Sequence, residues 1–173
     1  MTERGTLIDH EGRPAIRFRR EFARPAERVW AAITDPGDLA YWFPSKVRME
    51  PKAGGAIEFY GDQNQPEART SGTILVFEPP HRLAYTWLAS ELHFTIEPSA
   101  AGCVLTLIDV LEARDAAARN AAGWTVCLAE LEKHLAGIAA DGPHSGTAES
   151  WRRHYDSYVA AGLPSGAWIP GGA

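Results

Sequence analysis

The sequence predicts an α+β protein in which an antiparallel sheet wraps around one long helix. The first observation is a series of segments in which apolar and polar residues alternate, as in half-buried strands: 16–22, 46–50, 55–61, 71–78, 82–89, 91–98 and 102–111. The second is their close spacing, which favours hairpins between neighbouring strands. The third is a change to helical periodicity after Ala113, where apolar residues recur every three or four positions: Trp124, Leu128, Leu131, Leu135 and Ile138.

The first strand and the helices that follow it can be placed by local signals. Residues 1–13 are expected to form a loose tail. Pro25 is expected to open a short helix, which Asp35-Pro36 ends. A second short helix over 36–43 would finish with Trp42 and Phe43. The later strands are separated by turn signals at Gly54-Gly55, Gly61-Asp62 with a polar loop over 63–69, Pro79-Pro80 and 98–102.

The end of the chain predicts a long helix and a short appendage. The long helix is expected over 115–139, with Gly137 and Gly142-Pro143 ending it. A further helix over 147–161 would carry Trp151, Tyr155 and Tyr158 on one face, followed by an extended tail. The appendage is too short to fold alone, so we expect this face to pack on the main domain or on a partner. We therefore divide the chain into a domain over 14–140 and an appendage over 141–173.

Composition excludes several classes of function. The chain is 45% hydrophobic and 23% charged, as expected for a globular protein, and its net charge of −5 indicates no general affinity for nucleic acid. Its two cysteines, Cys103 and Cys127, lack the close spacing of a zinc site. The N-terminus lacks an apolar secretion signal, and no apolar run approaches the ~20 residues of a membrane span. We expect a cytoplasmic protein.

Several motifs together resemble the START-like (SRPBCC) superfamily, and most of all its branch related to the activator of heat shock protein 90 ATPase. They are REFARP at 20–25, VWAAITDP at 29–36, YWF at 41–43, GG at 54–55, GTI at 72–74, EPPHRL at 78–83, TW at 86–87, and GW with spaced leucines over 123–135. The resemblance implies a helix-grip fold: a curved seven-stranded antiparallel sheet around the long C-terminal helix, with two short helices between the first two strands. Its members bind or convert varied compounds or assist a chaperone, so the fold does not settle function.

Strand alternation assigns side chains to the concave face, where a ligand cavity would lie. A cavity lined by large rings suits a flat apolar or aromatic ligand. The alternative is that the same side chains fill the core. The candidate cavity residues are Trp42, Phe43, Phe59, Ile74, Tyr85, Trp87, Phe94, Leu107, Trp124 and Leu128.

Two charged residues, Arg20 and Asp109, fall on the same inner face. The helix-grip order makes the first and last strands antiparallel neighbours, so we expect these side chains to meet. A buried unpaired charge would cost several kcal/mol, which favours a pair. The pair is interpreted either as a polar anchor for a ligand or as a structural salt bridge.

Other polar residues indicate no catalytic or metal site. His93 is expected to point outward, and Glu130 with His134 suits a solvated pair on a helix better than a metal site. His144 and Ser145 lack the sequence context of a nucleophile. No cofactor is implied.

The leading hypothesis is a non-enzymatic protein that sequesters or senses a small apolar molecule in its cavity. A second is a cyclase, dehydratase or hydrolase acting on a polyketide-like compound, with Asp109 or Tyr85 as the acid or base. A third is an interaction module, either a chaperone modulator or a homodimer formed through Trp151, Tyr155 and Tyr158.

Overall fold

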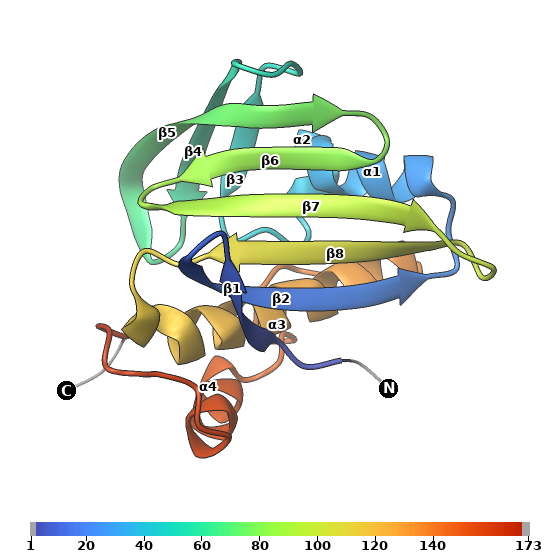
Figure 1. Ribbon diagram of the computed structural model, residues 1–173. Helices are drawn as coiled ribbons and strands as arrows, with labels where there is room; N and C mark the ends of the chain where they lie inside the picture. Colours follow the sequence, from blue (N-terminus) through green and yellow to red (C-terminus); the bar gives the residue numbers. More distant parts are fainter. Residues whose placement is uncertain (1–2, 171–173) are drawn as a thin grey trace.

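The computed structural model describes residues 3–170 as a curved antiparallel sheet packed around a long helix (Figure 1). The strands are β1 (Thr6–His10), β2 (Arg13–Phe22), β3 (Lys46–Met49), β4 (Ala56–Asp62), β5 (Gln65–Glu78), β6 (Arg82–Trp87), β7 (Ser90–Pro98) and β8 (Cys103–Val110). The helices are α1 (Ala26–Thr34), α2 (Pro36–Leu39), the 3₁₀ helix η1 (Arg114–Ala116), α3 (Ala117–Leu135) and α4 (Trp151–Ala160).

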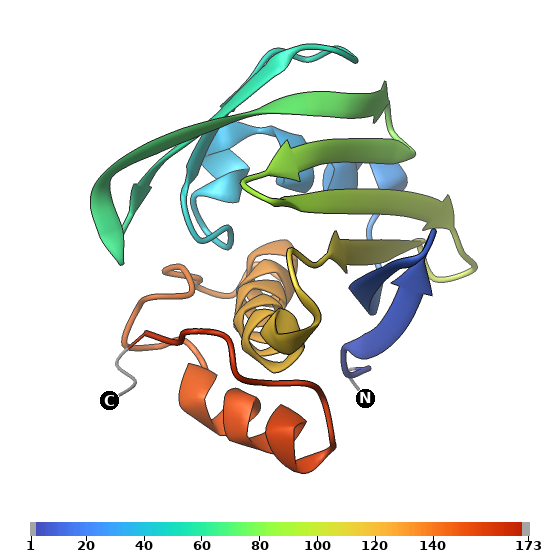
Figure 2. The ribbon, with the colours of Figure 1, turned by 60° about the vertical axis from the view of Figure 1, so that its left-hand side comes forward.

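The sheet contains eight strands in the order β1-β2-β8-β7-β6-β5-β4-β3, and every pair is antiparallel. Strands β2 and β8 are neighbours, with Phe18 opposite Leu107, as the resemblance implies. Figure 2 shows the sheet curving around α3, which is seen almost end-on. This curvature places the alternating apolar side chains of the strands against one face of the helix.

The eighth strand, β1, corrects the prediction of seven strands and a loose N-terminal tail. Residues Thr6–His10 pair with β2, and the connecting turn uses Glu11 and Gly12 at φ values of 52° and 83°. Both φ values are left-handed, the conformation that a tight hairpin turn requires. The strand is short and carries polar residues, so it shows no clear alternation. Residues 1–2 of the predicted tail lie outside the described part of the chain.

The polar stretch predicted as a loop over 63–69 is mostly strand. β5 begins at Gln65, so the turn between β4 and β5 is confined to the residues around Asn64. The first five residues of β5 are exposed or only partly buried. They bury no apolar face, so hydrophobic patterning could not reveal this part of the strand.

Helices α1 and α2 follow β2 and are joined at Asp35. Pro25 precedes the first turn of α1, as predicted, and the Asp35 carboxylate accepts hydrogen bonds from the N–H groups of Gly37 and Asp38. Helix α2 ends at Leu39, four residues earlier than predicted. Trp42 therefore lies in an irregular segment between α2 and β3.

Helix α3 supplies the layer opposite the sheet. It presents a mixed face of small and large apolar side chains to the strands, which allows close approach of its backbone: Ala117, Ala118, Ala121, Ala122, Trp124, Cys127, Leu128, Leu131 and Leu135. The helix ends at Leu135, before the predicted 139, and Gly137 follows at a φ of 75°. Ile138, expected on the buried stripe, is exposed.

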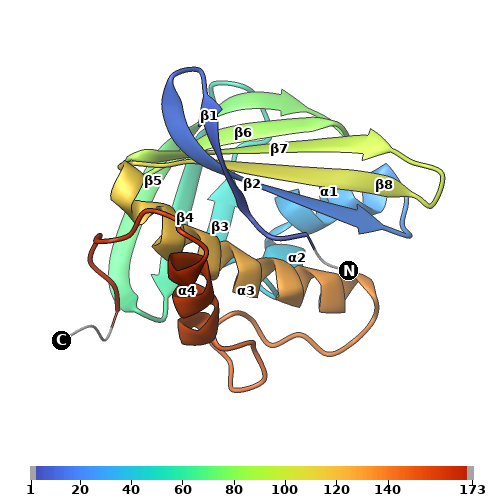
Figure 3. The same ribbon diagram turned by 60° about the horizontal axis from the view of Figure 1, so that its bottom comes forward.

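Helix α4 packs on the side of α3 away from the sheet (Figure 3). Tyr158 is the anchor: it is 2% exposed, its hydroxyl accepts a hydrogen bond from the Gly5 N–H at 2.9 Å, and it lies 2.9 Å from Thr125 Oγ1. After α4 the chain returns along α3, and the Ala118 N–H donates to the Pro164 carbonyl at 3.0 Å. Residues 171–173 of the predicted tail lie outside the described part of the chain.

Candidate functional site

Seven aromatic side chains form a continuous cluster between the sheet and α3, which we call the interior ring cluster. Its members come from the strands β4, β6 and β7, from the segment between α2 and β3, and from α3: Trp42, Phe43, Phe59, Tyr85, Trp87, Phe94 and Trp124. Their neighbouring ring centroids lie between 5.5 and 6.5 Å apart. Six of the rings contact one another in succession: Trp42, Phe94, Tyr85, Phe59, Trp87 and Trp124. Phe43 contacts both ends of this series, Trp42 and Trp124.

Phe43 lies at the centre of this cluster. Its ring centroid is 5.5 Å from Trp87, 5.7 Å from Trp124 and 6.1 Å from Phe59. The side chain is 3% exposed, although it belongs to the irregular segment between α2 and β3. Trp42, the other candidate cavity residue of this segment, is also buried in the interior.

The remaining predicted cavity residues, Ile74, Leu107 and Leu128, are buried in the same core. Two hollows among the described residues open to solvent. One, of about 200 Å³, is lined by residues of β4 and β5 that include Phe59 of the interior ring cluster, Tyr60 and Arg69. The other, of about 470 Å³, lies where α1 meets the end of α3. In the interior, the rings and the aliphatic side chains pack against one another.

Asp109 is a buried charged residue that contacts the interior ring cluster through Trp124. It lies on β8 next to Ile16 and Leu92 and is 1% exposed. Its Oδ2 accepts hydrogen bonds from Asn120 Nδ2 and Trp124 Nε1, both at 3.0 Å. Its Oδ1 is buried and has no hydrogen-bond partner among residues 3–170. Burial raises the pKa of Asp109 to about 6, against the opposing effect of the two hydrogen bonds.

The expected contact between Arg20 and Asp109 does not form. The register of β2 and β8 places Asp109 opposite Ile16 and Arg20 opposite Leu105, so the two charges lie four residues apart along the strands. Arg20 instead lies with its Nε 3.2 Å from Glu132 Oε1 in an ion pair, and its Nη1 donates to the Glu3 carbonyl at 2.7 Å. Arg20 is therefore tied to α3 and the N-terminus.

A chain of polar contacts links Asp109 to the surface, and sequence reasoning missed it. Ser90 Oγ donates to Glu112 Oε2 at 3.4 Å, and Arg119 donates to the other oxygen of Glu112. Arg119 Nε also donates to Asn120 Oδ1 at 3.0 Å, and Asn120 bonds Asp109. The helical spacing of Asn120 and Trp124, four residues apart, is the signal that could have revealed two donors on one face of α3.

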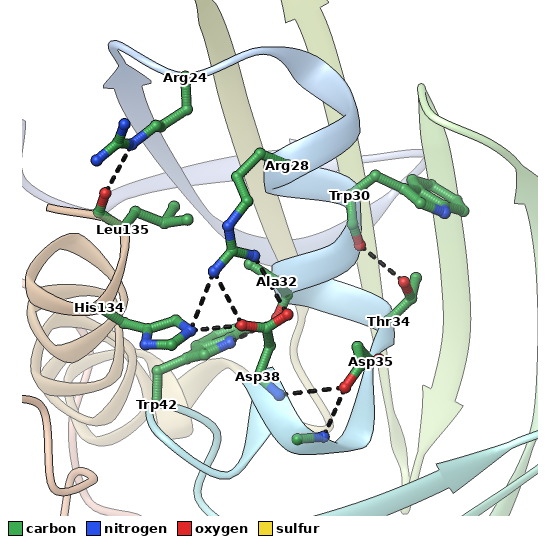
Figure 4. A network of polar contacts seen from close by, with 11 residues as sticks. Arg24, Arg28, Trp30, Ala32, Thr34, Asp35, Asp38, Trp42, His134 and Leu135 are labelled. Atoms are coloured by element: carbon green, nitrogen blue, oxygen red, sulfur yellow. Dashed lines mark hydrogen bonds and ion pairs between the residues drawn. The ribbon is translucent and has the colours of Figure 1, made fainter. Parts of the chain in front are cut away.

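A second polar network, away from the interior, joins α1, α2 and α3 (Figure 4). Arg28 donates to both oxygens of Asp38 at 3.2 and 3.0 Å, and His134 Nε2 lies 2.5 Å from Asp38 Oδ1. Burial alone raises the pKa of Asp38, but the bonds from Arg28 and His134 hold that pKa below its ordinary value. Tyr41 stacks on His134 at 4.4 Å. This network fastens α2, and with it the segment that carries Phe43, to the end of α3.

The other polar candidates have structural partners. The buried Glu130 carboxylate accepts hydrogen bonds from Lys133 and from the Asp141 N–H, so it secures the linker after α3. His93 is half-buried beside Glu91. Among residues 3–170, no group of three or more His, Cys, Asp or Glu side chains is arranged to hold a metal ion. No helix of these residues is long and apolar enough to cross a membrane.

The aromatic face of α4 is largely covered. Tyr158 is buried against α3 and the N-terminal segment, so it is not available to a partner. Trp151 and Tyr155 are half-buried and stack on each other at 5.0 Å. This face therefore attaches the appendage to the domain.

The sheet, the long gripped helix and the two short helices after β2 define a helix-grip protein. The sequence pattern of the family described as Activator of Hsp90 ATPase homolog 1-like protein matches residues 23–136. The chain therefore belongs to this family, within the START-like superfamily, which confirms the resemblance inferred from the motifs. No curated protein is similar enough in sequence to count as a match.

Solved structures share this fold at low sequence identity. EF2215 from Enterococcus faecalis, described as a conserved protein of unknown function, is 17% identical and superposes with a TM-score of 0.74, covering 91% of this chain and 89% of that one. CalU16 from Micromonospora echinospora is 23% identical with a TM-score of 0.68, covering 92% and 94%. NE0264 from Nitrosomonas europaea is 21% identical with a TM-score of 0.62, covering 71% and 94%.

Proposed function

We propose that this protein binds a small apolar or aromatic molecule between the sheet and α3, in space that Phe43 occupies in this structure. The ligand would displace Phe43 and take its place among the surrounding rings. Burial of apolar surface would supply the affinity, at about 25 cal/mol per Å². A few polar groups would set the orientation of the ligand, as is usual for small-molecule sites.

The observation that carries the proposal is the unpartnered oxygen of Asp109. A core built only for stability gains nothing from a buried carboxylate, because desolvation of the charge costs several kcal/mol unless it is fully bonded. Asp109 Oδ2 accepts two hydrogen bonds, whereas Oδ1 accepts none from residues 3–170. A ligand that bonds Oδ1 would offset this penalty.

Phe43 is the ring best suited to move. It lies in an irregular segment, so its displacement breaks no regular helix or strand. Its neighbour Trp42 is tethered by a hydrogen bond from Nε1 to the Ala32 carbonyl at 2.8 Å. The other five rings are carried by strands of the sheet or by α3. Rotation of Phe43 outward would leave a hollow bounded by Phe59, Trp87 and Trp124.

Methyl NMR spectroscopy with naphthalene as the probe tests this proposal. Shift changes are expected at Leu107 and Leu128, whose side chains are buried in the core. Leu75 and Leu88, which are 43% and 68% exposed, serve as internal controls and should not shift. Shifts confined to the exposed leucines, or no shifts at all, would contradict binding in the interior.

Two phenylalanine variants sharpen the test. Phe43→Ala removes the occluding ring, so naphthalene should bind more tightly to this variant than to the wild type. Phe77→Ala is the matched control, because Phe77 packs against Trp30 at 5.3 Å and is outside the interior ring cluster. Equal affinity of both variants would show that Phe43 does not occlude the site.

A second candidate function is acid–base catalysis on a polyketide-like compound, with Asp109 as the reacting group. A pKa of about 6 allows a carboxyl group to exchange protons efficiently near neutral pH. Tyr85, the other candidate, is fully buried, and this burial raises the pKa of its hydroxyl further above the ordinary value of 10.0. Loss of turnover in Asp109→Asn, with the fold and the binding of the compound intact, would support catalysis.

A further inference from the structure

We infer that the ligand of this interior is an organic amine, bound as an ammonium ion against Asp109 Oδ1 with its apolar body among the aromatic rings. The inference rests on the proposed function and adds the chemical class of the ligand. It is carried by the charges around Asp109 and by the faces of the rings beside it.

The interior carboxylate lacks a cation in direct contact. Both hydrogen bonds to Asp109 come from neutral groups, the amide of Asn120 and the indole of Trp124. The charged side chains that act on Asp109 are Glu112 and Arg119; these two are bonded to each other, and their effects on the pKa of Asp109 oppose one another. Buried charges in proteins are normally paired or bonded to a metal. An ammonium group on the ligand would supply the missing positive charge.

The aromatic rings beside Asp109 add a second feature that suits a cation. Trp124 bonds Asp109 directly, and the Trp87 ring lies 5.6 Å from the Trp124 ring. The faces of tryptophan rings attract cations, most strongly where water is excluded. The cation–π contacts found among residues 3–170 all involve rings outside the interior ring cluster: Phe18, Tyr60, Tyr155 and Tyr158.

The arrangement of bonds also favours an ionised Asp109 over a protonated one as the anchor. Oδ2 accepts two N–H donors at 3.0 Å, and these bonds stabilise the ionised form of Asp109. A protonated Asp109 would instead donate from Oδ1 and would select a ligand with a carbonyl or ether oxygen. The pKa of about 6 leaves the carboxylate ionised in most molecules at neutral pH. The two ligand classes therefore differ in the pH dependence of their binding.

Three probes of one shape separate the classes: 1-naphthylmethylamine, 1-naphthylmethanol and 1-naphthoate. Isothermal titration calorimetry near neutral pH should show the amine binding at least about tenfold more tightly than the alcohol, since a charge-assisted hydrogen bond is roughly twice as strong as a neutral one. The carboxylate should bind most weakly, because like charges repel. As the pH falls from about 7.5 to about 5, amine affinity should fall about tenfold as Asp109 takes up a proton.

Two variants show whether Asp109 is responsible. Asp109→Asn should remove the preference for the amine, so that the amine and the alcohol bind this variant within about twofold of each other. Glu97→Gln removes the same formal charge from an exposed position on β7, so it should keep the preference. Loss of the preference in both variants would assign it to net charge and overturn the inference.

The remaining outcomes separate the inference from the proposed function. Naphthalene binding in the interior, together with equal or tighter binding of the alcohol, would overturn the amine inference and leave the proposed function standing. An affinity for the amine that rises as the pH falls would also overturn the amine inference and leave the proposed function standing, because it would indicate that protonated Asp109 anchors the ligand. Failure of naphthalene and all three probes to bind would overturn both.

Discussion

Replacement of Asp109 by asparagine should make the protein more stable near neutral pH, with a gain that shrinks in acid. Asparagine keeps an oxygen that can accept both hydrogen bonds from α3, but it carries no charge. The folded-state pKa of Asp109 is about 6, and the ordinary value is 3.8. Because each unit of pKa shift corresponds to about 1.4 kcal/mol, the buried carboxylate destabilises the wild type by about 3 kcal/mol at neutral pH.

The sign of the pH dependence follows from proton uptake. The pKa is raised on folding, so the folded protein binds more protons than the unfolded chain between about pH 4 and pH 6. This group therefore makes the wild type more stable as the pH falls through that range. From about pH 7.5 to about pH 4.5, the stability advantage of Asp109→Asn should shrink by about 2 kcal/mol.

Urea unfolding followed by circular dichroism at several pH values measures this difference directly. The matched control is Glu97→Gln, an exposed substitution of the same charge, which should change the unfolding free energy by less than about 0.5 kcal/mol. If the difference in unfolding free energy between Asp109→Asn and the wild type stays constant with pH, or grows in acid, desolvation of the buried carboxylate does not destabilise the folded wild type.

Three further substitutions probe the packing. Phe43→Ala should lower the unfolding free energy by about 3–5 kcal/mol in urea titrations, because Phe43 is enclosed by four rings. Phe77→Ala should lower it by less, because Phe77 is only partly buried. Equal losses in the two variants would contradict the central placement of Phe43. Tyr158→Phe should cost about 1–3 kcal/mol, since it leaves the backbone N–H of Gly5 without its acceptor; an unchanged thermal midpoint would show that this contact does not hold α4. Gly72→Ala should destabilise the sheet by about 1–3 kcal/mol, because an added Cβ would lie 2.3 Å from the carbonyl oxygen of Thr86; full stability would mean that β5 and β6 separate easily.

Much of the architecture was predictable because it depends on periodicity. The alternation of apolar residues located β2 and β6–β8, and the recurrence of Trp124, Leu128 and Leu131 located α3. Elements without an apolar face escaped this reasoning. The strand β1 and the first part of β5 are defined by backbone pairing, which leaves no hydrophobic pattern in the sequence.

Some features of the candidate site were also predictable from the sequence, and others were not. Strand alternation correctly placed Asp109, Tyr85 and Trp87 on the inner face, since side chains in a strand point to opposite sides in turn. The pairing of Asp109 was wrong because it depends on register. A shift of four residues along β2 and β8 separates Arg20 from Asp109, and no local signal in the sequence reports it.

The sequence by itself determined the family, the layers and the side of the sheet on which the residues of the strands with alternating apolar residues lie, because these follow from local periodicity and short motifs. Only the tertiary structure decided which groups meet: Phe43 with four rings, Asp109 with Asn120 and Trp124, and Tyr158 with the N-terminal segment. These contacts join residues distant in the chain. Their geometry is set by strand register and by the packing of helices on the sheet, which depend on the whole fold at once.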